Sequence, residues 1–115
     1  MKPEIRQLRN DKGSLIEEAE YEDGLLHGTR KLWSENGALI GDATYNAGIL
    51  DGPSRIWNVT GQLVVECNYG AGELDGQYRS WWDNGQLKEE GSYKQGRKAS
   101  GYDWYKDDGT IWQRS

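Results

Sequence analysis

The chain has 115 residues, 35% of them hydrophobic, with a formal net charge of -5 at pH 7 and an isoelectric point near 4.9. Such an acidic chain lacks the excess of Lys and Arg that binding to nucleic acid or to an anionic membrane surface requires. The single cysteine excludes an internal disulfide, and no apolar run approaches the roughly 20 residues of a membrane span. We therefore expect one small cytoplasmic domain whose charge suits a basic protein partner.

A repeat of 24 residues runs through the chain. Its columns read Gly13, Gly37, Gly61, Gly85 and Gly109; Leu15, Leu39, Leu63, Leu87 and Ile111; Tyr21, Tyr45, Tyr69 and Tyr93; and Trp33, Trp57, Trp81 and Tyr105. A fixed period of this length indicates a stack of similar units. We predict a repeat domain over 13–115, made of units 13–36, 37–60, 61–84 and 85–108 and a partial unit 109–115.

Residues 1–12 come first in chain order, at the place that the second half of a unit would take. Ile5 and Leu8 are apolar, but the tryptophan of the column is missing. Because the ends of repeat arrays are atypical, we expect a degenerate half-repeat or an N-terminal cap.

Each following unit predicts a β-hairpin. In unit 61–84, apolar residues alternate from Leu63 to Tyr69, and a second strand rich in Tyr and Trp follows from Glu73. Both kinds of turn end in glycine, which suits three-residue hairpin loops. These loops place Tyr69 opposite Glu73, Trp81 opposite Leu87 and Arg79 opposite Glu89. We predict an all-β fold, a single-layer antiparallel meander of about nine strands.

Residues that carry chemistry are sparse. Cys67 occupies a column of small residues, so we interpret it as a half-buried structural residue; the alternative is a reactive thiol. His27, the single histidine, has no candidate partner set and is expected on an exposed strand position. No Cys/His spacing suits zinc and no nucleophile–base arrangement stands out. We expect no catalytic residues, no metal and no cofactor.

One acidic column is a candidate binding surface. Glu18, Asp42, Glu66 and Glu90 hold the same position in four units, about 10 Å apart along the sheet. They are expected to point away from the Leu and Tyr columns. Such a column suits the steering of a basic partner; the alternative is a solvated face whose charges pair with neighbouring Lys and Arg.

The aromatic C-terminal end is the second candidate. Alternation sends Trp82, Tyr102, Trp104 and Trp112 to one face, opposite the regular Trp column. Exposed rings of this kind are preferred anchors of protein interfaces. The alternative is that they cap the last hairpins.

The stretch from Trp82 to Gly96 resembles the MORN repeat, and more closely its bacterial variant, because Asn84-Gly85, Leu87 and Tyr93 stand at the positions of that pattern. The resemblance covers about 13–112 and implies a row of hairpins forming one elongated, twisted sheet. Small acidic proteins of such repeats look like the YwqK-type antitoxin or immunity family, whose members bind toxins. This chain departs from the pattern at Ser100 and at 58–60.

The resemblance and the charge together favour an antitoxin or immunity protein that occludes a basic toxin without being an enzyme. One alternative is a non-toxin interaction scaffold that self-associates. Another is an enzyme or carbohydrate binder that uses the Trp-rich end.

Overall fold

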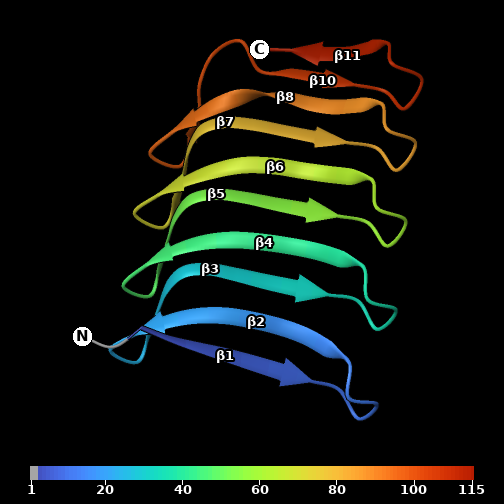
Figure 1. Ribbon diagram of the computed structural model, residues 1–115. Coiled ribbons are helices and arrows are strands. Elements are labelled where there is room, and N and C mark those ends of the chain that lie inside the picture. Colours follow the sequence, from blue (N-terminus) through green and yellow to red (C-terminus); the bar gives the residue numbers. More distant parts are fainter. Residues whose placement is uncertain (1–2) are drawn as a thin grey trace.

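The computed structural model describes residues 3–115, which form one eleven-stranded antiparallel sheet without helices (Figure 1). The strands are β1 (Pro3–Arg9), β2 (Leu15–Glu22), β3 (Leu25–Trp33), β4 (Leu39–Asn46), β5 (Ile49–Trp57), β6 (Leu63–Gly70), β7 (Glu73–Trp81), β8 (Leu87–Lys94), β9 (Arg97–Lys98), β10 (Asp103–Tyr105) and β11 (Ile111–Arg114). Each strand from β1 to β8 pairs with its sequence neighbour, β10 and β11 continue the sheet beyond β8, and β9 pairs with β8. The predicted all-β, single-layer meander is confirmed; the predicted strand number is too low, because 3–9 and the C-terminal segments form strands of their own.

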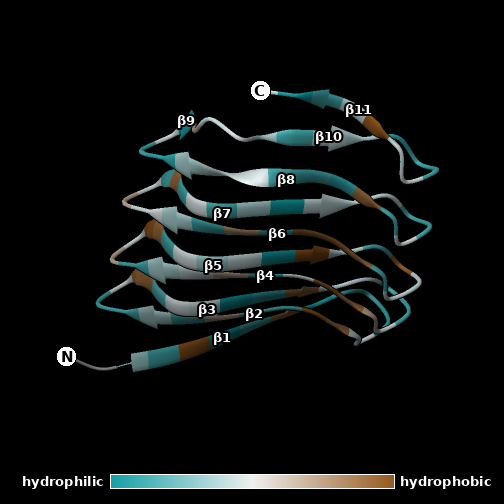
Figure 2. Ribbon diagram, turned by 90° about the horizontal axis from the view of Figure 1, so that it is seen from above, coloured by the Kyte–Doolittle hydropathy of each residue, from teal (hydrophilic) through white to brown (hydrophobic). Residues whose placement is uncertain are grey.

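The sheet is thin and extended. Its extents are 47 × 33 × 13 Å, and its radius of gyration is 16.3 Å, compared with about 13 Å for a compact domain of about 100 residues. With no second layer over the described residues, few side chains are buried; they include Ala19, Cys67, Ser80 and Tyr102. Figure 2 shows apolar segments near the strand ends and polar segments mid-strand. Both faces of the sheet are therefore open to a partner.

The two kinds of turn differ in length. At 82–86, the Trp82 N–H donates to the Gln86 carbonyl over 2.8 Å, and the Gly85 N–H donates back to the Trp82 carbonyl over 2.8 Å. This is the predicted three-residue loop. After β6 the turn has only two residues, Ala71 and Gly72, both at positive φ (51° and 88°), as in the mirror-image turns that suit the sheet twist.

The shorter turn corrects the predicted pairing of β6 with β7. Tyr69 lies opposite Leu74, not Glu73, because the loop has one residue fewer than expected. Gly76 then absorbs the mismatch: it sits at φ 105° within a bulge between the Cys67–Tyr78 and Tyr69–Leu74 pairs. The glycines at 28 and 52 repeat this conformation.

A second irregularity changes the pairing of β7 with β8. Trp81 lies opposite Leu87 as predicted, but the register shifts by one residue between Ser80 and Trp81. Arg79 therefore lies opposite Glu90, and its Nε is 2.8 Å from the Glu90 carboxylate. The predicted Arg79–Glu89 pair is wrong for this reason.

The two ends of the array differ. At the N-terminal end, β1 pairs with β2 from Pro3 to Arg9, and every residue of β1 is exposed. At the C-terminal end the unit is broken, because β9 stops at Lys98 and the chain leaves the sheet until Asp103. This break contains Ser100, where the repeat pattern is lost, whereas residues 58–60 form a regular turn around the Asn58 side chain.

Candidate protein-binding surfaces

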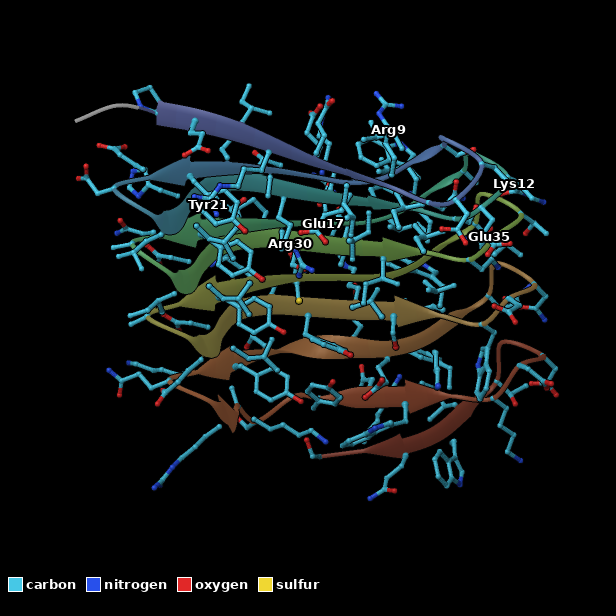
Figure 3. The ribbon with its side chains drawn as sticks, turned by 90° about the horizontal axis from the view of Figure 1, so that it is seen from below. Arg9, Lys12, Glu17, Tyr21, Arg30 and Glu35 are labelled. Atoms are coloured by element: carbon cyan, nitrogen blue, oxygen red, sulfur yellow. The ribbon has the colours of Figure 1, made fainter. Side chains whose placement is uncertain are left out.

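The register sorts the side chains onto two faces. We call the face that carries Tyr21, Tyr45, Tyr69 and Tyr93 the tyrosine face, and the opposite face the ladder face. Figure 3 views the sheet from below with Tyr21, Glu17 and Arg30 among its labelled side chains. Successive residues of a strand point to opposite faces, so the acidic column of even-numbered residues belongs to the ladder face.

The acidic column lies in a row that crosses the whole sheet. In strand order, paired residues of that row are Gln7, Glu18, Lys31, Asp42, Arg55, Glu66, Arg79, Glu90, Asp103 and Arg114. Acidic and basic side chains alternate along most of it. The four predicted carboxylates thus share one face, but basic residues on the intervening strands separate them.

Most charges of this row, from Asp42 to Arg114, lie in ion pairs. Arg55 Nε lies 3.0 Å from the Glu66 carboxylate, and Arg55 Nη1 lies 3.9 Å from Asp42. Glu18 accepts a 2.7 Å hydrogen bond from the Gln7 amide. The geometry matches the alternative of a solvated face with paired charges, and half-exposed pairs of this kind add little stability. Binding of a partner by the four acids stays a prediction.

A second acidic column lies at the edge of the sheet. It comprises Asp11, Glu35, Asp83 and Asp107, each in the three-residue turn that ends one unit, and we call it the acidic turn edge. All four are exposed, and within residues 3–115 none of them lies in an ion pair. Successive turns are two strands apart, which places neighbouring members of adjacent units about 10 Å apart. Figure 3 shows Glu35 at this end of the strands.

Sequence reasoning missed the acidic turn edge. The signal was present as the 24-residue spacing of acids at 11, 35, 83 and 107, with Val59 as the one interruption. The turns were interpreted through their glycines, so the first turn residue was not compared between units. This edge carries the unpaired negative charge that was expected of the strand column.

The aromatic end is divided between two places. Tyr102 is fully buried, with its ring centroid 5.8 Å from that of Tyr93 and 4.6 Å from that of Trp104. Its hydroxyl donates a 3.0 Å hydrogen bond to Glu89. Tyr102 therefore caps the tyrosine face and is not free for a partner.

Trp82 and Trp112 lie apart from that cluster. They line a hollow of about 400 Å³ with Tyr105, and the Trp82 indole N–H donates to the Tyr105 carbonyl over 3.3 Å. Trp112 is 65% exposed. The predicted single face for Trp82, Tyr102, Trp104 and Trp112 is wrong, because the break before β10 interrupts the alternation on which it relied.

Burial shifts the titration of Tyr78, which lies on the tyrosine face. It raises the pKa of Tyr78 to about 12, and the Glu89 carboxylate opposes ionisation further. Because the pKa of Tyr78 in the folded protein lies above its ordinary value of 10.0, the contribution of the neutral phenol to stability is fully present below pH 10. This contribution is lost as the pH rises toward 12. We expect the free energy of unfolding, measured by urea titration, to fall across this window. The free energy of unfolding of Tyr78→Phe should fall less steeply with pH than that of the wild type. Equal slopes would contradict the assignment of the pH dependence to Tyr78.

Cys67 is buried, and burial raises the pKa of its thiol, with the Glu66 charge adding to the effect. Because the thiolate is the reactive species, we expect slow modification by a disulfide reagent at neutral pH in the folded protein and complete modification in urea. Absorbance of the released thiol measures both rates. Immediate reaction of the folded protein would instead support the reactive-thiol alternative.

His27 has a structural contact. Its Nδ1 accepts a 3.1 Å hydrogen bond from the Ala47 N–H of the next turn, and its Nε2 lies 3.5 Å from Glu22. Asp51 makes the equivalent contact to Ala71 one unit later, over 3.4 Å. Within residues 3–115 no cluster of metal-binding side chains is present, and no helix long and apolar enough to cross a membrane is found.

Two segments of the chain match a known repeat. Residues 26–47 and 74–95 match the MORN repeat variant. The matches coincide with the β3–β4 and β7–β8 hairpins. MORN repeats indicate a protein-interaction module, and the open faces of this sheet agree with that role. No curated protein matches the chain.

Proposed function

We propose that the protein is an antitoxin or immunity protein that neutralises a basic bacterial toxin by covering it. It acts in the cytoplasm, by binding and not by catalysis. The observation that carries the proposal is the acidic turn edge: exposed carboxylates recur at the repeat spacing on a thin sheet, two of whose hairpins match the MORN repeat variant. An extended row of unpaired charge of one sign raises the association rate of an oppositely charged partner.

The toxin partner is sought first in the product of the neighbouring gene. The purified protein should bind that product and should restore growth to cells that express it. Failure of both would remove the antitoxin role and leave only an interaction module.

The binding surface is tested by two matched sets of neutralising substitutions. The first set is Asp11→Asn, Glu35→Gln, Asp83→Asn and Asp107→Asn; the control set is Glu18→Gln, Asp42→Asn, Glu66→Gln and Glu90→Gln. Each set removes four negative charges, so their net charges are equal. We expect the first set to lower the association rate at least tenfold at low salt and the control set to lower it less. A larger loss of association rate in the control set would instead place the binding surface on the strand column of Glu18, Asp42, Glu66 and Glu90.

A non-toxin scaffold that self-associates is the second candidate. The observation that favours it is the outer edge of β1, whose residues are all exposed, including Ile5 at 66%. Unpaired strand edges are templates for pairing with another chain. Light scattering after size-exclusion chromatography distinguishes a monomer from an assembly. Ile5→Lys should dissociate an assembly that forms through the β1 edge into monomers.

A further inference from the structure

A column of long side chains crosses the tyrosine face, and one member is missing. The column reads Arg6, Arg30, Ser54, Tyr78 and Tyr102, at intervals of 24 residues. The neighbouring strands present small residues opposite it: Ala19 and Ala43 flank Arg30, whereas Cys67 and Gly91 flank Tyr78. Arg30 and Tyr78 thus lie between small neighbours, whereas Ser54 is too short to fill its place.

The short serine leaves a hollow in the middle of the face. Ala43, Ser54 and Cys67 are paired in succession across three strands, so three small side chains follow one another. The resulting hollow has a volume of about 200 Å³, and its wall includes Tyr45 and Tyr69. Ile56 lines it as well and is 47% exposed, which is high for an apolar side chain beside a cavity.

The chain itself shows what occupies such a place. Two repeats further along the same column, Tyr102 covers Gly91 so closely that a Cβ on Gly91 would overlap its ring. Tyr78 lies between Ser54 and Tyr102 in this column, and its ring centroid is 5.6 Å from that of Tyr93. The hollow at Ser54 therefore lies in line with the rings of Tyr78 and Tyr102, at a position of the column that has no ring of its own.

Charge decides between the two kinds of side chain that the column uses. Arg30 has Glu17 for its guanidinium, at 3.1 Å, and the Tyr102 hydroxyl has Glu89. Each of these acids lies 13 residues before its partner in the column, and the equivalent position before Ser54 is Gly41, which offers no carboxylate.

The other charges around the hollow are occupied. Asp42 contributes to the lining, but its carboxylate is paired with Arg55 on the ladder face. A guanidinium in the hollow would meet Arg30 without a counterion. A neutral ring would meet Tyr45, Tyr69 and apolar side chains.

We propose that the hollow at Ser54 binds an aromatic side chain, a phenol or a similar ring, presented by a protein partner. The partner supplies the ring that the column lacks at Ser54. In the last unit, Tyr102 of the chain itself supplies the ring at the equivalent position. This inference names the chemistry of an anchor and rests on the proposed role in protein binding. It is independent of the acidic turn edge, because that edge lies at the ends of the strands.

The test uses p-cresol, the side chain of tyrosine, with the purified full chain and no partner. Nuclear magnetic resonance titration of backbone amides should show shifts at Gly41, Ala43 and Ser54, with a Kd on the order of 10 mM for a ligand of this size. Ser54→Ala should retain these shifts, and Ser54→Tyr should abolish them. Because p-cresol binding needs no toxin, its outcome stands apart from that of the growth-rescue experiment.

Filling the hollow also has a readout in stability. Ser54→Tyr should leave the melting temperature unchanged or raise it, because Tyr78 is accommodated on the other side of Cys67, which also neighbours Ser54. Ile56→Ser should weaken p-cresol binding at least threefold without filling the hollow. No amide shifts in the wild type, shifts confined to the Trp82–Trp112 hollow, or unchanged shifts in Ser54→Tyr would each overturn the proposal.

Discussion

Replacing Tyr102 with alanine is expected to lower the free energy of unfolding by about 3–5 kcal/mol, the range for removing a large buried ring. Tyr102 is the largest fully buried side chain among the described residues, and it joins β10 to β8 through Gly91 and Glu89. Natural domains have total stabilities of about 5–15 kcal/mol. The loss is therefore a large part of what holds the C-terminal strands in place. Urea unfolding followed by tryptophan fluorescence measures it.

Two control variants separate the ring from its hydroxyl and from its neighbourhood. Tyr102→Phe keeps the ring and loses the bond to Glu89, which still accepts a 2.9 Å hydrogen bond from Ser80; we expect a loss of about 1 kcal/mol. Trp112→Ala removes a ring that is 65% exposed, with an expected loss within about 0.5 kcal/mol. Equal losses for Tyr102→Ala and Trp112→Ala would contradict the capping role.

The repeat made much of this fold predictable. The 24-residue period predicts a stack of hairpins, and the Asn84-Gly85 turn predicts a three-residue loop with Trp81 opposite Leu87. These features depend on local turn chemistry and on strand alternation. Both can be read from one unit and then checked against the others.

The errors arose where backbone geometry departs from the common preferences of its residues. Ala71 adopts φ 51°, and Gln95 does the same one unit later. Neither residue type favours positive φ, so a two-residue turn is hard to expect from sequence. One missing loop residue and the bulge at Gly76 then shift the pairing of β6 with β7. The separate irregularity between Ser80 and Trp81 shifts the expected ion pair of Arg79 from Glu89 to Glu90.

The candidate surfaces were less predictable than the fold. Glu66 and its column were correctly expected on one face, but which basic side chains pair with them depends on the register of the neighbouring strands. A one-residue shift in register decides whether Arg79 meets Glu89 or Glu90. The burial of Tyr102 depends on the break around Ser100, where the repeat gives no guidance on where the chain goes.

Gly91→Ala is expected to destabilise the protein by about 1–3 kcal/mol, the usual cost of overpacking. The repeat alone predicts the opposite sign, because alanine occupies this column at 19 and 43, and alanine replacing glycine inside a strand gains about 0.5–1 kcal/mol. Gly91 does not have positive φ, so backbone strain is not the cause. The cause is the Tyr102 ring, which lies where the new methyl group would be.

A double-mutant cycle isolates this cause. If the collision with Tyr102 accounts for the loss, Gly91→Ala should cost nothing, or stabilise slightly, when it is made in the Tyr102→Ala background. The coupling between the two substitutions should then be about 1–3 kcal/mol, whereas Gly91→Ala and Trp112→Ala should be additive. Additive effects of Gly91→Ala and Tyr102→Ala would show that the ring does not rest on this glycine. Gly91→Ala thus tests whether a residue of the tyrosine face must be small because an aromatic ring packs on it. The proposed aromatic side chain of a partner would pack in the same way on the small residues around Ser54.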